Sequence, residues 1–419
     1  MKYESYALTD VGRKRPHNED FMLSRPHIGL HIVCDGMGGH AAGEVASALA
    51  VQAAAEVIER NIEEIHAGMS GSREGRKSSL ELVEAAVQEA NARVYESSEA
   101  NADQRGMGTT LTLLIVHRER ALVAQVGDSR LYLVRAEQSH QVTTDHTILT
   151  DALRAGRVDP NDENAKRKLN ALTRAVGVHP SVEVDTLELD TLPGDVLLLC
   201  SDGLCGYLDD FDLAAFFRHS TNASAARDLV EFALKRGGHD NITVITVHVR
   251  DAVETEQSLR VRLTLDTLKS IPLFHYLTFN ELLRVIPVCQ ARFLMEGDQV
   301  IGEGESGADF FIVIEGRVRV HVGENEITEM GPGQYFGEMS LVDNRPRSAS
   351  VTAVEPGYLI QISRRDFYEV LRGDSVMAVK LLWNFIQTLS GLVRNQNTTL
   401  VDESSLLAHP YDGTTEDGS

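Results

Sequence analysis

Two acidic residues of this chain stand where an apolar run ends and glycine begins. Asp35 follows the run 28–34 and precedes Gly36, and Asp202 follows the run 195–200 in the same way. Glycine allows a sharp turn and a close backbone approach, so a carboxylate and a bare carbonyl could face one ligand. Such oxygens suit a hard divalent cation, Mg²⁺ or Mn²⁺. A plain turn with a capping Asp would give the same local pattern.

Further acids occupy comparable places along the chain. Asp240 comes just before the apolar run 242–249, and Glu19 and Asp20 adjoin the short apolar segment 21–23. Carboxylates at several strand ends are expected to converge on one rim of a sheet structure. Because clustered carboxylates repel one another, bound cations would resolve the repulsion.

Two residues near these acids have both a functional and an ordinary interpretation. Arg15 lies in the mixed-charge segment 11–20, which is typical of a solvated loop but could also meet an anion. Asp128 lies in a Gly-Asp-Ser turn between apolar runs, which by itself indicates a hairpin.

The composition limits the classes of function. The 419 residues carry a net charge of -22, which argues against a nucleic-acid partner because phosphate backbones require a basic surface. The four cysteines show no paired spacing and are expected to be free thiols. No signal peptide or run of membrane-spanning length is evident, so we expect a soluble cytoplasmic protein with no membrane partner.

The elements around the acids mix helices and strands. Residues 44–65 predict a helix, and a capping box at Ser78 and Glu81 predicts that a second helix begins there. Short apolar runs predict the later strands at 109–117, 121–126, 131–134, 195–200 and 242–249. The polar, partly helical segment 145–176 is expected to form a mobile lid.

Seven motifs in order resemble the metal-dependent protein phosphatases of type 2C, in their bacterial form. They are VGRKRPHNED, DGMGGHAAGEVAS, GTTLTLL, VGDSRLYLVR, LTRAVG, CSDGL and DNITV, within residues 4–250. The resemblance implies an α+β fold in which two antiparallel sheets are packed together and flanked by helices. It also implies two metal ions, Mn²⁺ or Mg²⁺, that activate water for attack on a phosphoryl group. By motif match the ligands would be Glu19, Asp35, the Gly36 carbonyl, Asp202 and Asp240, with Asp128 sharing a weaker third metal.

The resemblance also implies roles for residues that hold no metal. Asp20 would orient the attacking water, and Arg15 would bind the substrate phosphate through its planar fork. Several relatives place His directly after the Asp-Gly pair, where it could protonate the leaving alcohol. Here that position is Met37, so His40 could replace it as general acid, or it could serve in packing or capping while water takes this role.

The last part of the chain predicts a β-roll. Short strands alternate with glycine-rich turns, and residues 266–395 resemble cyclic-nucleotide-binding domains, with 336–353 matching their phosphate-binding cassette. The match implies that Arg347 clasps the cyclic phosphate, Glu338 accepts a ribose hydroxyl, and Gly337 permits close approach. Ser348 favours cAMP over cGMP mildly. A degenerate domain that binds nothing is the alternative.

The expected organisation is a phosphatase domain at 1–250, a linker at 251–265, a sensor domain at 266–395 and an acidic disordered tail at 396–419. We expect a protein Ser/Thr phosphatase that acts on phosphoproteins and is controlled allosterically by a cyclic nucleotide. The apolar helix predicted after Gly373 could also support a homodimer. Two alternatives are a non-catalytic cyclic-nucleotide sensor and a transcription regulator; the acid set disfavours the first, and the net charge disfavours the second.

Overall fold

The computed structural model describes residues 2–38, 42–135, 137–159, 162, 164, 168–208, 211–250, 256–387 and 390. The chain divides into two compact units, residues 1–262 and 263–419, and each is described here by itself.

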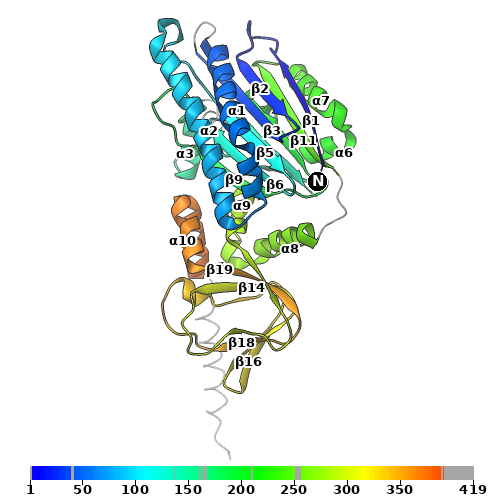
Figure 1. The fold of residues 1–419 in the computed structure, drawn as a ribbon, viewed down its shortest axis with the longest axis vertical. Coiled ribbons are helices and arrows are strands. Elements are labelled where there is room, and N and C mark those ends of the chain that lie inside the picture. Colours follow the sequence, from blue (N-terminus) through cyan, green and yellow to red (C-terminus); the bar gives the residue numbers. More distant parts are fainter. Residues whose placement is uncertain are drawn as a thin grey trace, which may run out of the picture. The chain divides into compact units, whose positions relative to one another are not determined.

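Two antiparallel sheets form the centre of the first unit (Figure 1). One sheet has the order β1 (Lys2–Asp10), β11 (Ile242–Arg250), β10 (Val196–Cys200), β7 (Arg130–Arg135) and β8 (Gln138–Gln141). The other has the order β2 (Asp20–Arg25), β3 (Leu30–Met37), β5 (Leu111–His117), β6 (Arg120–Val126) and β9 (Asp185–Asp190), with β4 (Gly108–Thr109) paired to β3. The sheets contact each other through β1, β2, β3, β10 and β11.

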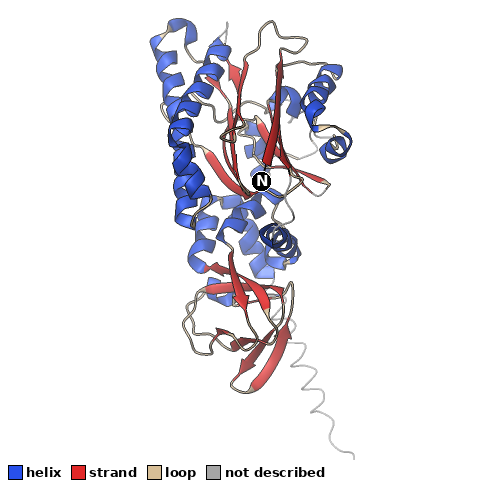
Figure 2. Ribbon diagram, turned by 45° about the vertical axis from the view of Figure 1, so that its right-hand side comes forward, coloured by secondary structure: helices blue, strands red, loops and turns tan. Residues whose placement is uncertain are grey.

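Helices cover the outer face of each sheet (Figure 2). The long antiparallel pair α1 (Ala42–Met69) and α2 (Arg73–Ala100) packs on the sheet that contains β3. Helices α6 (Leu213–His219) and α7 (Asn222–Lys235) pack on the other sheet. The short helices α3 (Ile148–Arg154), η1 (Ala102–Gln104) and α5 (Asp202–Cys205) lie in connections. This arrangement confirms the predicted sandwich of two antiparallel sheets flanked by helices.

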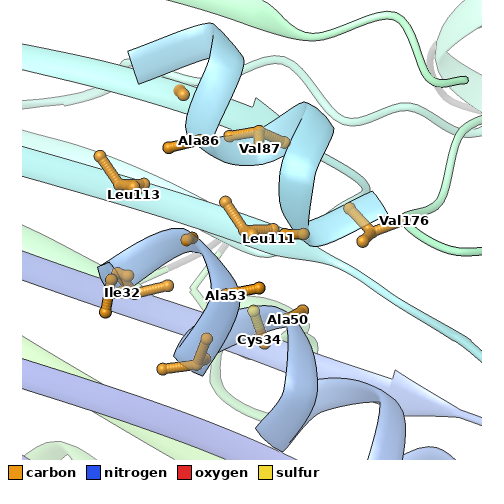
Figure 3. Packing of buried hydrophobic residues seen from close by; sticks show 14 of the residues in the cluster. Ile32, Cys34, Ala50, Ala53, Ala86, Val87, Leu111, Leu113 and Val176 are labelled. Carbon is orange, nitrogen blue, oxygen red and sulfur yellow. The ribbon is translucent and has the colours of Figure 1, made fainter. Parts of the chain in front are cut away.

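The core follows from the alternation of side chains along the strands. Leu111, Leu113 and Ile115 of β5 are fully buried in the cluster formed with α1 and α2. The intervening residues of β5 face the other sheet, since neighbouring side chains of a strand point to opposite faces. Small residues on α1 allow the helix to lie close to the strands, as Ala50 and Ala53 do beside the labelled side chains of β3 and β5 in Figure 3.

The predicted start of the second helix is wrong. Helix α2 begins at Arg73, and its N-cap is Ser72, whose hydroxyl accepts a hydrogen bond from the Gly75 N–H. Ser78 lies inside the helix instead. The segment 68–77 therefore holds the end of α1, a short connection and the first turn of α2.

The second unit contains two four-stranded antiparallel sheets and short helices. The sheets have the orders β12-β19-β14-β17 and β13-β18-β15-β16. Their strands are β12 (Gln290–Leu294), β13 (Gln299–Ile301), β14 (Asp309–Glu315), β15 (Val318–Val322), β16 (Asn325–Met330), β17 (Tyr335–Phe336), β18 (Ser350–Ala353) and β19 (Gly357–Ser363). Apolar side chains from both sheets share one buried cluster, as the predicted β-roll requires.

Helices pack on the outside of this roll around a second buried cluster. They are α8 (Glu256–Ser270), η2 (Pro272–Phe274), α9 (Phe279–Val285), η3 (Ile286–Val288), η4 (Glu338–Leu341), α10 (Arg364–Gly373) and a helix over residues 375–387. Helix α8 takes up part of the segment 251–265 that was expected to be a linker, while residues 251–255 and the expected tail 396–419 lie outside the described residues.

Two further observations bear on the sequence-based expectations. All four cysteines are free, with Cys34, Cys200 and Cys205 buried and Cys289 partly buried. Across the part of the chain that the structure describes, no helix is both long and apolar enough to cross a membrane.

Candidate functional site

Acidic side chains from separate strands and loops meet at one end of the two sheets. Asp20 of β2 stands directly opposite Asp35 of β3 in the antiparallel ladder. Asp202 begins α5 directly after β10, and Asp240 lies two residues before β11. Asp20 and Asp35 each interact electrostatically with Asp202. The sheets therefore bring together carboxylates that lie more than 200 residues apart in the sequence.

The backbone at Asp35 is fixed from two sides. Its carbonyl accepts hydrogen bonds from the Thr110 N–H at 2.9 Å and the Thr109 hydroxyl at 2.8 Å. Its own N–H donates to the Thr110 hydroxyl at 2.9 Å. On the other side, the N–H of Gly36 donates to the Glu19 carbonyl at 3.1 Å. This network holds the strand end that carries the carboxylate and the Gly36 carbonyl.

Glu19 lies against the start of α1 because two glycines leave room for it. A Cβ on Gly43 would lie 2.7 Å from Glu19 Oε1, and a Cβ on Gly36 would lie 2.6 Å from the Glu19 carbonyl oxygen. The Ser47 hydroxyl donates to that carbonyl at 2.6 Å. The glycine of the GEVAS stretch thus has a definite steric role, which the sequence interpretation did not assign.

Asn241 is a further residue that the sequence interpretation missed. Its side-chain oxygen accepts from the Glu19 N–H at 2.8 Å, and its amide nitrogen donates to the carbonyls of Val11 and His17, both at 2.9 Å. This buried side chain therefore ties the loop before β2 to the start of β11. Its place in the DNITV motif, next to Asp240, was the available signal.

Ser201 plays a comparable part for Asp20. Its hydroxyl donates to Asp20 Oδ2 at 2.7 Å, and it accepts from the Thr243 N–H at 3.0 Å. The other oxygen of Asp20, Oδ1, is buried and has no hydrogen-bond partner among the residues that the structure describes. Burying a carboxylate oxygen without a hydrogen bond costs free energy. Its presence here therefore indicates that a group outside the protein chain completes this site.

The electrostatics of the site disfavour full ionisation. Burial, together with the neighbouring acids Asp202 and Asp240, raises the pKa of Asp20 to about 7. Burial and the neighbouring Asp202 raise the pKa of Asp128 to about 7. Burial and the nearby Asp20 also hold the pKa of Asp35 well above its usual range, and a protonated Asp35 shares a hydrogen bond with Asp202. Without a cation, the cluster relieves its repulsion by retaining protons.

Arg15 supplies the nearby positive charge. It donates to Asp240 Oδ2 at 2.6 Å, and its side chain remains 46% exposed. Within the described residues, no three His, Cys, Asp or Glu side chains form a ready chelate for one ion. Asp35 and Asp202 are engaged with each other, and Asp240 is engaged with Arg15. The donor set nevertheless fits hard cations, because it consists of crowded carboxylates, the orphaned Asp20 oxygen and the adjoining Gly36 carbonyl.

The remaining predicted residues of this unit have different outcomes. Asp128 lies in the turn between β6 and β7 and interacts electrostatically with Asp202. Met37 is the last residue of β3 and pairs with Gly108 of β4. His40 lies outside the described residues, as does part of the expected lid at 145–176; the described part of that segment includes α3.

The structure of the second unit brings Gly337 and Arg347 together. Gly337 has φ 78°, a conformation that favours glycine, and it precedes η4. The Arg347 guanidinium donates to the Asp309 carbonyl at 2.8 Å and lies 3.5 Å from the Gly337 carbonyl. A Cβ on Gly337 would lie 2.8 Å from this guanidinium. The positive φ and the close approach both explain why a glycine stands here.

Glu338 and Ser348 complete the predicted cassette residues. Glu338 is the first residue of η4 and is partly buried. Burial raises the pKa of its carboxyl, and the nearby Arg347 offsets only part of this rise. Ser348 is exposed beside Arg347. Three of the four predicted residues, Gly337, Glu338 and Arg347, are thus neighbours, and Ser348 is adjacent to Arg347 in the chain.

Comparisons with known proteins match both units of the chain to known families. Residues 13–236 match the family model described as protein phosphatase 2C, and residues 291–374 match the cyclic nucleotide-binding domain. The serine/threonine phosphatase stp of Listeria monocytogenes serotype 4b is 35% identical over 248 residues, which are 57% of this chain and 93% of the relative. Protein phosphatase PhpP of Streptococcus pneumoniae serotype 2 is 33% identical over 253 residues, which are 59% of this chain and 98% of the relative.

Solved structures show the same fold. The serine/threonine phosphatase PstP/Ppp of Mycobacterium tuberculosis has a TM-score of 0.54 and 32% identity, covering 60% of this chain and all of the relative. The catalytic domain of PstP in complex with two manganese ions has a TM-score of 0.51 and 34% identity, covering 59% of this chain and 99% of that chain. The chain belongs to the protein phosphatase 2C family. It carries a cyclic nucleotide-binding domain after the phosphatase domain, and both the predicted fold and the predicted enzyme class are confirmed.

Proposed function

We propose that this protein hydrolyses phosphoserine and phosphothreonine in other proteins with the help of Mn²⁺ or Mg²⁺. The observation that carries the proposal is the meeting of Asp20, Asp35 and Asp202 at one end of the sheets, where their ionisation is disfavoured without a cation. The manganese ions in the complex of the related PstP domain support the same choice of metal.

The metal ligands we propose are those that the sequence predicted. They are Glu19, Asp35, the Gly36 carbonyl, Asp202 and Asp240, with Asp128 and Asp202 at a weaker third position. When bound, the cations would activate a water molecule and neutralise charge on the phosphoryl oxygens. Hard oxygen ligands and tight backbone support at Asp35 and Glu19 favour this assignment.

Other residues of the chain would bind and orient the reactants. Arg15 is exposed, charged and next to Asp240, so its fork can receive the phosphate of a phosphoprotein. Asp20 is buried, and Ser201 donates to one of its oxygens, so it would orient water rather than bind substrate. We propose His40 or water as the group that protonates the leaving alcohol.

The direct test replaces two of the proposed ligands by their amides. Asp35→Asn and Asp202→Asn should each lower Mn²⁺-dependent hydrolysis of a phosphothreonine peptide by roughly a thousandfold or more, an order at which loss of preorganised charge stabilisation is felt. Circular dichroism should show the wild-type fold, since the amides keep the shape of the acids. Either variant, well folded and nearly as active as wild type, would exclude the proposed centre.

We also propose that a cyclic nucleotide, cAMP in preference to cGMP, binds at Gly337, Glu338, Arg347 and Ser348 and changes the phosphatase activity. The support is the close approach of the Arg347 guanidinium to Gly337 and the match of this region to the cyclic nucleotide-binding family. A nucleotide would control activity only if it bound two global states with different affinities.

The main alternative is a signalling protein that senses a cyclic nucleotide without catalysis. The clustered acids of the first unit argue against it, because a purely structural role gives no reason to bury Asp20 with an unpartnered oxygen. The homodimer also stays a prediction; the exposed apolar residues Val379, Leu382, Trp383 and Ile386 of the helix over 375–387 are compatible with it.

A further inference from the structure

His146 makes a two-point contact with the turn that carries Asp128. The N–H of Gly127 donates to His146 Nδ1 at 3.1 Å, and the backbone N–H of His146 donates to the Gly127 carbonyl at 3.0 Å. Gly127 has φ 104°, a conformation open mainly to glycine, so the local sequence alone does little to fix this turn. The imidazole is only 6% exposed, which places the contact inside the protein.

The acceptor role of Nδ1 determines what the other ring nitrogen does. A neutral imidazole whose Nδ1 accepts must carry its proton on Nε2. Nε2 lies 3.4 Å from Asp185 Oδ2 of β9 and 3.3 Å from Arg174 Nη1, so both groups contact the ring on that side. Arg174 donates to the other oxygen of Asp185 at 2.8 Å. Asp185 and Arg174, which are bonded to each other, therefore both pack against the far side of the ring.

The same histidine closes the base of the segment that was expected to form a lid. Its carbonyl accepts from the Thr173 N–H at 2.8 Å, and the next residue, Thr147, forms a β-bridge with Leu172. The two ends of the segment 148–171 therefore meet directly beside His146. One side chain thus joins the base of this segment to the Asp128 turn.

We propose that His146 is a positioning residue, which holds the Gly127–Asp128 turn so that Asp128 faces Asp202 and can bind metal. This inference rests on the proposed metal-dependent function. Asp185 and Arg174 assist by packing against the opposite side of the imidazole. Arg174 belongs to the LTRAVG motif. Its place beside His146 gives this motif a structural role that the resemblance to relatives did not provide.

The test compares two substitutions in the full chain. His146→Leu keeps much of the volume but removes the acceptor, whereas His146→Asn keeps an oxygen close to the position of Nδ1. Hydrogen-exchange mass spectrometry of the metal-free protein should show exchange about tenfold faster in the leucine variant, in peptides that contain Gly127. Tenfold corresponds to about 1.4 kcal/mol, the size of one hydrogen bond. The asparagine variant should restore most of the protection.

Calorimetric titration with Mn²⁺ gives the second measurement. In His146→Leu the weakest resolved Mn²⁺ site should lose about tenfold in affinity, while His146→Asn should lie closer to wild type. His248→Leu is the matched control, because His248 is also a buried histidine but lies near the far end of β11. It should leave both the exchange of the Gly127 peptides and the Mn²⁺ affinity unchanged.

The outcomes separate this inference from the proposed function. Unchanged exchange around Gly127 in a folded His146→Leu protein would refute the contact itself, whether or not metal binds. Faster exchange with wild-type Mn²⁺ affinity would refute the positioning role. If the wild-type protein bound no Mn²⁺ at all, the proposed metal centre would fail, and with it the role assigned to His146 at Asp128.

Discussion

Single residues in the acid cluster differ in pKa and in hydrogen bonding from the same residues in water. Asp20 is buried, and Ser201 donates to one of its oxygens while the other has no partner in the described part of the chain. Burial and the neighbouring Asp20 and Asp202 raise the pKa of Asp35 well above its usual range. Such an arrangement gains free energy when a cation replaces the protons, so the same residues that destabilise the metal-free protein would drive metal binding.

Arg15 allows binding of substrate to be separated from binding of metal. Arg15→Ala should raise the KM for a phosphothreonine peptide by roughly ten- to a hundredfold, because one charge-assisted contact is worth about 1.5–3 kcal/mol. The Mn²⁺ affinity should stay equal or become tighter, since Asp240 loses its ion-pair partner. Lys14→Ala is the control, as Lys14 is an exposed neighbour of the same charge. A calorimetric loss of Mn²⁺ binding in Arg15→Ala would contradict the phosphate-binding role.

The raised pKa of Asp20 predicts how the stability of the metal-free protein depends on pH. Its pKa rises from 3.8 to about 7 on folding, so the folded state holds more protons than the unfolded state between these values. Its contribution is therefore favourable below about pH 4 and is lost as the pH rises towards 7, by up to about 4 kcal/mol. Asp20→Asn mimics the protonated form and should lose this dependence.

Buried histidines change the stability with pH in the opposite direction. The test therefore uses the difference in stability between wild type and Asp20→Asn at each pH. Burial lowers the pKa of His31 and His248 to about 4, and their effect is to stabilise the protein as the pH rises towards 6.5. Thermal unfolding of wild type and Asp20→Asn in EDTA, from pH 4 to 8, cancels that shared effect. The stability of wild type relative to the variant should fall with rising pH; a flat difference would show that Asp20 is ionised throughout.

At the scale of elements, the start of α1 is shaped around Glu19. The helix begins beside β2 and β3, and Gly43 is the residue where a side chain would meet the Glu19 carboxylate. Ser47, one turn later, holds the Glu19 carbonyl. The helix thus supports the candidate ligand as well as the core of the sheet.

Gly43→Ala tests that support. The added methyl group would lie 2.7 Å from Glu19 Oε1, so the carboxylate must move. We expect roughly a ten- to hundredfold loss of Mn²⁺-dependent turnover, the scale that small misplacements of a catalytic group produce. Gly75→Ala in α2 is the matched control, because its Cβ would make only ordinary contacts. Equal turnover in the two variants would show that activity does not depend on the observed position of the Glu19 carboxylate.

The two units of the molecule carry different candidate sites. The first holds a cluster of carboxylates, and the second holds Arg347 beside the turn at Gly337. A cyclic nucleotide carries a phosphate anion, which Arg347 can recognise if it releases the Asp309 carbonyl that it contacts in this structure. Because the proposed nucleotide site and the proposed metal centre lie in separate units, regulation requires a nucleotide-dependent change that reaches the first unit.

Arg347→Ala should weaken cAMP binding by roughly ten- to a hundredfold, the factor expected for a lost charge-assisted contact. It should leave the nucleotide-free phosphatase rate unchanged. Arg345→Ala removes the same charge two residues away, and the 88% exposure of Arg345 makes it the control. Calorimetry with cAMP and cGMP measures binding, and peptide hydrolysis measures coupling. Failure of both nucleotides to bind at millimolar concentration would exclude the sensor, whereas binding without any change in hydrolysis would exclude only the regulation.

Much of this protein could be predicted from local sequence. The apolar runs that end at Asp35 and Asp202 predicted strands followed by turns, because buried strands and glycine turns each leave a short-range pattern. The motifs around these acids also predicted the family. The start of α2 was predicted wrongly, because the Ser-x-x-Glu pattern at Ser78 and Glu81 is a local signal, whereas the helix extends back to Arg73 and is capped by Ser72.

The tertiary structure decided which groups support those acids. Asn241 bonds to Glu19, Val11 and His17 across more than 200 residues, and His146 reaches the Gly127 turn and Asp185 at once. No periodicity or motif spacing encodes such partners, because they are set by the pairing of distant strands. The sequence by itself determined the chemical groups of the site and the strands that carry them. Only the folded sheets determined which carboxylates lie close enough to raise one another's pKa, because that depends on distances between segments far apart in the chain.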